Sequence, residues 1–183
     1  MFFMEYISHY YSPLGGITLA SDGKSLTGLW FDGQKHFGST LESISETNDD
    51  LPIFRDTRLW LDIYFKGKDP LFTPKLNAKG TEFRKHVWTI LLGIPYGETM
   101  TYGEIACKIA EERNKPSFSA QAVGGAVGHN PISLIIPCHR VVGYEGNLTG
   151  YAGGIERKRY LLRNEERGKR NEAKRLSVGR AKR

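Results

Sequence analysis

Apolar residues in the first third of the chain alternate with polar ones over short runs that turn residues separate. The runs cover residues 6–11, 17–20 and 26–31, and Pro, Gly, Asp and Ser lie between them. Alternation bounded by such residues is typical of antiparallel strands joined by tight turns. Over residues 54–65 the apolar side chains recur at helical spacing instead. We therefore predict a small antiparallel sheet covered by one helix.

The pattern changes after residues 66–80, a Gly- and Pro-containing segment that we interpret as a linker between two units. A helical stripe then begins at Thr81 and continues until a Pro-Tyr-Gly sequence ends it. Thr101 and Glu104 fit a capping box at the start of a second helix. The small residues of 119–128 predict a third helix, and two short helices so joined indicate a helix-turn-helix, although the connection is longer than usual.

These patterns predict an α+β protein with three parts: an N-terminal unit over residues 1–75, a helical unit over residues 80–167, and a tail over residues 168–183. The tail holds seven basic residues and one acidic residue, which accounts for the net charge of +6 of the whole chain. Because the tail lacks apolar periodicity, we predict that it is disordered. The remaining chain is neutral overall, so charge alone does not indicate a nucleic-acid partner.

Apolar runs and cysteines restrict the class of protein further. No run approaches the ~20 apolar residues of a membrane span, which favours a cytoplasmic protein that is not bound to a membrane. The two cysteines are too few for a disulfide framework, and no Cys or His pair has metal-ligand spacing. We therefore expect no metal site and a reduced thiol.

The two cysteines differ in their surroundings. Residues 132–136 are apolar and predict a buried strand or extended segment, which ends in Pro-Cys-His-Arg and places Cys138 at a turn. On local evidence Cys138 is either a nucleophile or a buried structural cysteine, since an unassisted thiol is mostly protonated at neutral pH. Cys107 lies in the apolar pattern of a helix, and we predict that it is buried and structural.

Three motifs together resemble the O6-alkylguanine-DNA alkyltransferase family: IPCHRVVG at 136–143, AVGGAVGHNP at 122–131 and GYAGG at 150–154. The resemblance spans residues 80–167, and the first third is similar to the family's ribonuclease-H-like N-terminal domain, which precedes a winged-helix-like DNA-binding domain. It implies direct DNA repair, in which an alkyl group moves once and irreversibly from O6 of guanine to Cys138. It also implies a monomer without cofactor, acting on double-stranded DNA that contains O6-alkylguanine.

The resemblance assigns the catalytic roles to four residues. Cys138 is the alkyl acceptor, His139 is its base through a water molecule, and Glu165 orients that histidine. Asn130 ties the recognition helix to the active-site turn. From spacing alone, a surface pair is the favoured interpretation of His139 and Glu165. Asn130 could also be a plain helix stop before Pro131.

Binding roles follow from the same resemblance. Because a guanine inside a duplex cannot reach a buried thiolate, it has to be flipped out of the stack, and a narrow helix of small residues then suits the minor groove. Close helix packing explains those small residues equally well. Two positions depart from the family: Gln121 replaces an arginine that fills the vacated stack, and Ala152 replaces a serine. The implied substrate-binding residues are Tyr102, Val141, Tyr151 and Ala152, and the implied DNA-binding residues are Thr101, Gln121, Ala122, Gly125 and Arg140.

Three other classes remain as alternatives. An alkyltransferase-like protein would recognise the lesion without chemistry, but such proteins have another residue at the position of Cys138. A helix-turn-helix regulator would need an effector site or a dimer interface, and a cysteine hydrolase would need an acyl-substrate cleft. The sequence indicates none of these three features.

Overall fold

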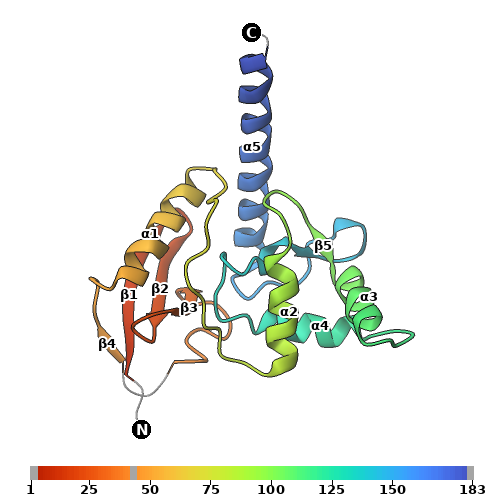
Figure 1. Ribbon diagram of the computed structural model, residues 1–183, viewed down its shortest axis with the longest axis horizontal. Coiled ribbons are helices and arrows are strands. Elements are labelled where there is room, and N and C mark those ends of the chain that lie inside the picture. The colour runs from red at the N-terminus through yellow and green to blue at the C-terminus, as the bar shows by residue number, and fades with distance from the viewer. Residues whose placement is uncertain (1–3, 42–44, 181–183) are drawn as a thin grey trace.

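The N-terminal unit is a four-stranded sheet with one helix on it in the computed structural model, which describes residues 4–41 and 45–180. Three strands form an antiparallel meander, and a short fourth strand lies parallel to the first, which gives the order β3-β2-β1-β4 (Figure 1). The predicted sheet and helix are confirmed. Their bounds are β1 Glu5–Ser12, β2 Gly15–Ser21, β3 Leu26–Phe31, β4 Ser45–Thr47 and α1 Pro52–Phe65.

The outer edge of β3 is paired with segments from beyond the sheet. Leu29 donates its N–H to the carbonyl of Pro131 at 2.9 Å and accepts from the N–H of Ser133 at 2.9 Å. Leu26 pairs in the same way with the linker at residues 75–77, with both bonds at 2.8 Å. Pairing covers an edge that would otherwise expose its backbone groups. It also fixes the segment before Cys138 against the N-terminal unit.

The second unit is mostly helical. Successive helices α3 and α4 pack against each other, as expected for a helix-turn-helix. The predicted capping box at α3 is confirmed, because the Glu104 N–H donates to Thr101 Oγ1 at 3.1 Å and the Thr101 N–H donates to Glu104 Oε2 at 2.6 Å. The bounds are α2 Glu82–Leu92, β5 Met100–Thr101, α3 Tyr102–Glu112, α4 Ala120–Gly128, β6 Val141–Val142 and α5 Ile155–Arg180.

Residues 132–136 are buried as predicted, but they form turns rather than a strand. Only Ile132 makes a bridge, to Leu29 of β3. The side chain of Asn130 makes the hydrogen bonds to this backbone that a neighbouring strand would otherwise make. It donates to the carbonyls of Ile132 and Ile136 at 3.2 and 2.8 Å and accepts from the N–H of Ile132 at 3.0 Å.

The prediction of a disordered tail is wrong for residues 168–180, which continue α5 as a projecting helix (Figure 1). Residues 181–183 lie outside the described residues. A helix without an apolar stripe can be stabilised by strong helix formers and by ion pairs one turn apart, such as Arg170 with Glu166. Gly168 lets the helix pass the linker, because a Cβ there would lie 2.3 Å from the carbonyl oxygen of Gly67.

None of the helices in the described part of the chain combines the length and hydropathy that a membrane crossing requires.

Candidate active site

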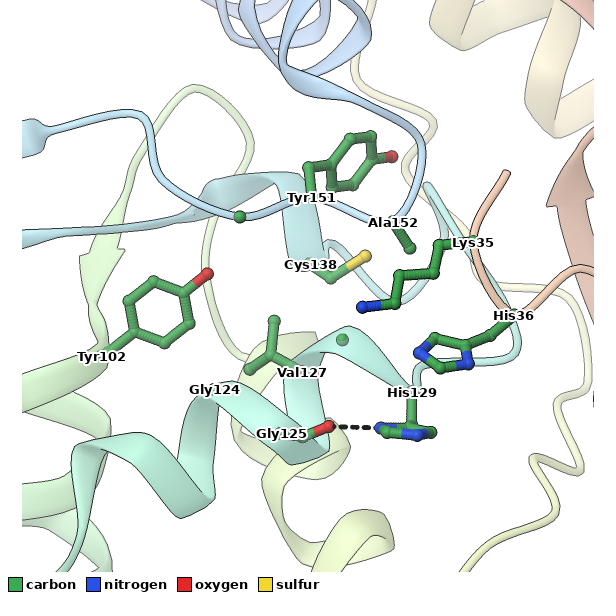
Figure 2. Close-up of a pocket in the computed structure, with 12 residues that line it drawn as sticks. Lys35, His36, Tyr102, Gly124, Gly125, Val127, His129, Cys138, Tyr151 and Ala152 are labelled. Atoms are coloured by element: carbon green, nitrogen blue, oxygen red, sulfur yellow. Dashed lines mark hydrogen bonds between the residues drawn. The ribbon is translucent and has the colours of Figure 1, made fainter. Parts of the chain in front are cut away.

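Cys138 lies at the bottom of a pocket between the two units, on a single turn of 3-10 helix, Cys138–Arg140. Its side chain is 4% exposed, and Figure 2 shows the sulfur directed into the pocket. Asn130 Nδ2 donates to Cys138 Sγ at 3.1 Å, and Asn130 itself is buried at the end of α4. The asparagine therefore connects the last turn of α4 to the sulfur and to the backbone that precedes it. This is more than the plain helix stop that spacing alone allowed.

His139 and Glu165 form a buried pair directly behind Cys138, not a surface pair. Both side chains are 0% exposed, and His139 Nε2 lies 2.6 Å from Glu165 Oε1. A carboxylate can only accept, so Nε2 carries the proton and Nδ1 is left as a base. Nδ1 is buried and has no hydrogen-bond partner among the described residues. The imidazole is thus oriented with its basic nitrogen available.

Glu165 is held as a carboxylate by several donors. Arg140 donates from Nε to Oε2 at 2.9 Å and from Nη2 to Oε1 at 3.1 Å, the Gly97 N–H donates to Oε2 at 2.9 Å, and the Tyr64 hydroxyl donates to Oε1 at 2.8 Å. Burial opposes ionisation, but His139 and Arg140 outweigh it and lower the pKa of Glu165 to about 2. Burial lowers the pKa of His139 below its ordinary value, against the attraction of Glu165. At neutral pH the pair is therefore a carboxylate and a neutral imidazole.

The surroundings of the Cys138 thiol shift its pKa in opposite directions. Burial raises the pKa of Cys138, whereas the Asn130 hydrogen bond and the charge of Lys158 lower it. Lys158 is itself buried on α5, and burial lowers its pKa to about 8. Its ammonium donates to the carbonyls of Val141, Thr149 and Gly150 at 2.5, 3.0 and 3.1 Å. Lys158 therefore fixes the loop that forms one wall of the pocket and places a cation near the sulfur.

The pocket has a volume of about 320 Å³, which lies in the range of binding sites for small molecules. Tyr102 from the start of α3 lies on one side of it, and Tyr151 and Ala152 lie near Cys138 on another (Figure 2). Residues of α4, including Gly125, form the opposite rim. Of the residues predicted to bind substrate or DNA, the structure brings Tyr102, Tyr151, Ala152 and Gly125 together around the thiol.

The other residues predicted to bind substrate or DNA do not line this pocket. Gln121 and Ala122 are exposed on α4, and Thr101 caps α3. Val141 does not line the pocket, and its carbonyl accepts from Lys158. Arg140 corrects a prediction: it was expected to contact DNA, but its guanidinium is buried and occupied by Glu165 and by the Ile94 carbonyl at 2.7 Å.

The prediction for Cys107 is also wrong, because its side chain is exposed on α3. The buried stripe of that helix is formed by Ile105, Ala106, Ile109 and Ala110. The apolar pattern of this helix is confirmed, but Cys107 lies beside the buried stripe rather than within it.

The glycines of α4 are not all explained by helix packing. Val123, Ala126 and Val127 form the buried face. A Cβ added at Gly125 or Gly128 would meet nothing within 4 Å among the described residues. Packing therefore does not require glycine at these two positions, which favours a surface kept narrow for something outside the protein.

Sequence reasoning missed four residues of this region. Tyr64 comes from α1 and reaches Glu165, and Lys158 resembles any other charged residue of a solvated helix when read along the chain. Lys35 and His36 follow β3 and line the pocket mouth from the N-terminal unit. No local motif signals Lys35 or His36, because the tertiary pairing of β3 with residues 131–133 brings them near Cys138.

Comparison with known proteins gives consistent matches over both units. Residues 6–78 match the model of the 6-O-methylguanine DNA methyltransferase ribonuclease-like domain, and residues 82–167 match that of the 6-O-methylguanine DNA methyltransferase DNA binding domain. The chain is 42% identical over 162 residues to the methylated-DNA–protein-cysteine methyltransferase of Haemophilus influenzae, covering 88% of this chain and 86% of the relative. It is 45% identical over 155 residues to that of Mycobacterium tuberculosis, covering 85% and 88%. Its structure is similar to that of M. tuberculosis OGT in complex with DNA, with a TM-score of 0.76 and 42% identity over 90% of this chain and 94% of the other.

Proposed function

The chain belongs to the 6-O-methylguanine DNA methyltransferase family, and we propose that it repairs DNA by moving an alkyl group from O6 of guanine onto Cys138. The observation that carries this proposal is the buried thiol at the bottom of the pocket, hydrogen-bonded by Asn130 and backed by the His139–Glu165 pair. The presence of Cys138 argues against a lesion-binding protein without chemistry.

The proposed reaction is a single displacement at the alkyl carbon. His139 Nδ1 takes the thiol proton through a water molecule, and Glu165 stabilises the imidazolium that forms. Cys138 Sγ then forms a bond to the alkyl carbon while the bond from that carbon to O6 breaks, and the electron pair leaves on guanine. The proton returns to guanine, so the products are a thioether and a normal base. Because the thioether is stable, each molecule reacts once.

Binding of the lesion is proposed to use both rims of the pocket. The exposed face of α4, with Gln121, Ala122 and Gly125, enters the minor groove while Thr101 contacts the backbone. Gln121 fills the space that the flipped base leaves. The base then lies between α4 and the loop that Lys158 holds.

Contacts inside the pocket are proposed to select guanine. Tyr102 donates to the base, and the backbone of Tyr151 and Ala152 donates to O6. The Val141 carbonyl is a weaker candidate acceptor for the exocyclic amine, because Lys158 already donates to it. All these residues come from one chain, so we propose that a monomer acts without a cofactor. We also propose that it acts in the cytoplasm, where thiols stay reduced.

One experiment tests the function directly. The protein is incubated with a duplex that contains a single O6-methylguanine, and its intact mass and peptides are measured. We expect a mass gain of one methylene equivalent, located on the peptide that contains Cys138 and absent from Cys138→Ala. A methyl group on Cys107, or transfer by Cys138→Ala, would show that the nucleophile is another residue.

A further inference from the structure

The loop after β3 brings a cation from the N-terminal unit to the mouth of the pocket. Lys35 and His36 line the pocket on the side away from Tyr102, and Figure 2 shows the Lys35 side chain extended into it, with its nitrogen toward the centre. Lys35 is the one lysine or arginine among the described residues that line this pocket, and none of them is acidic. A positive charge therefore enters the space where the flipped nucleotide is proposed to lie.

Three contacts across the boundary between the two units hold this loop in place. The Lys35 N–H donates to the carbonyl of Ala152 at 3.0 Å. The Ser133 hydroxyl donates to Gln34 Oε1 at 3.3 Å. The rings of His36 and His129 stack with centroids 4.2 Å apart. The backbone of Lys35 is thus fixed to the active-site wall, so the side chain starts from a defined position.

The ammonium group of Lys35 has no partner in the part of the chain that the structure describes. Among the described residues, Lys35 Nζ makes no hydrogen bond and no ion pair, in contrast to Lys158, whose ammonium is fully occupied by carbonyls. The neighbouring side chain at position 152 is only a methyl group, which leaves room for the lysine stem (Figure 2). A free ammonium at a partly enclosed site attracts oxyanions more strongly than it does in open water.

From these observations we propose that Lys35 is a specificity-determining residue that binds an anionic oxygen of the flipped nucleotide. The proposal rests on the proposed function. Two groups of the substrate have this chemistry: a phosphate beside the lesion, and a carboxylate carried by the adduct, as in O6-carboxymethylguanine. In the second case the pocket favours negatively charged adducts over neutral ones.

The test compares Lys35→Met, which keeps the length but removes the charge, with Lys35→Arg, which keeps the charge. Lys24→Met is the matched control, because Lys24 is exposed in a turn of the same unit and does not line the pocket. Rate constants for alkyl transfer to Cys138 are measured by intact mass, with duplexes that contain O6-methylguanine or O6-carboxymethylguanine.

Each source of the anion gives its own result. If the carboxylate is bound, Lys35→Met slows carboxymethyl transfer about tenfold and leaves methyl transfer unchanged. If a phosphate is bound, both rates at limiting DNA fall together, and the slope of log affinity against log salt becomes shallower by about 0.9. In either case Lys35→Arg retains most of the rate.

A Lys35→Met protein that matches Lys24→Met on both substrates and at all salt concentrations would overturn the proposal. Failure of the wild-type protein to transfer either group would instead contradict the proposed function.

Discussion

Glu165 is a buried carboxylate whose ionisation couples catalysis to stability. Its pKa is lowered from 4.5 to about 2 in the folded protein. A carboxylate with a lowered folded pKa stabilises the protein fully above its unfolded pKa, and this contribution is lost as the pH falls through the folded value. The pH window in which this residue matters is therefore about 4.5 down to about 2.

Glu165→Gln tests this coupling. At neutral pH we expect the free energy of unfolding to fall by about 3 kcal/mol or more, because Arg140 loses its buried counter-charge. The difference from wild type narrows as the pH falls from 4.5 toward 2. Denaturant unfolding at several pH values measures it, with exposed Glu166→Gln as the control. A difference that stays constant with pH would contradict the assignment of the carboxylate.

Asn130 is expected to control the reactivity of the thiol. Asn130→Ala removes the hydrogen bond that lowers the pKa of Cys138, so that pKa rises further and less thiolate is present at neutral pH. Methyl transfer then slows at neutral pH and recovers partly at alkaline pH. The pH profile of the transfer rate measures this in a Cys107→Ser background, which removes the exposed second thiol. If the variant were slower by the same factor at every pH, Asn130 would act on packing alone.

For single residues, the sequence was informative only where they lie in recognisable motifs. Cys138 and Asn130 were identified with their neighbours because the three motifs that resemble the family contain them. Glu165 lies outside those motifs in a charged stretch, where spacing favoured a surface pair. Lys35 could not be found, because its approach to Cys138 depends on how β3 pairs with residues 131–133.

Among the helices, α4 combines a packed face with a surface that packing leaves open. Gly125→Ala is expected to stabilise the protein by about 0.5–1 kcal/mol, because alanine is a better helix former and no atom opposes its Cβ. The same methyl group widens the face proposed to enter the minor groove, so affinity for a lesion-containing duplex falls. Thermal unfolding and a binding titration measure the two effects. Stabilisation without loss of affinity would show that this face does not contact DNA closely.

The projecting part of α5, residues 168–180, points away from α4 (Figure 1). It therefore cannot reach the groove that α4 is proposed to enter. Deleting residues 173–183 removes five basic residues and no acidic one. With a short duplex we nevertheless expect an unchanged salt dependence of binding and an unchanged transfer rate. Titrations at several salt concentrations measure this. A slope that becomes shallower by about 0.9 or more would show that the helix contacts phosphates.

The helices also differ in how far the sequence pattern predicts them. Apolar periodicity located α1 and α2, and the capping box located the start of α3. The end of α5 could not be predicted in this way, because no apolar stripe extends beyond the body and its helical state depends on polar propensity and ion pairs.

Across the whole molecule, the two units share one hydrophobic core. Buried residues from the sheet, α1, α2, α4 and α5 belong to a single cluster. The edge of β3 is paired both with the linker and with residues 131–133 of the second unit. The sequence indicated two units and a linker, but it gave no sign of this shared packing.

We therefore expect the two units to unfold together in one transition. Far-UV and near-UV circular dichroism should give the same denaturant midpoint, because neither unit keeps its buried surface without the other. Leu29→Ala, at the pairing between the units, should lower that midpoint for both signals. Two separate midpoints in the wild-type protein would show that the units are independent.

The projecting end of α5 makes the molecule well suited to attachment. Twelve residues beyond Gly168 at about 1.5 Å of rise each give a helical arm of about 18 Å. A dye, bead or sensor chip coupled at the tip would stand clear of the folded body, on the side away from α4. Molecules immobilised through this arm would all present the pocket to the solution in one orientation.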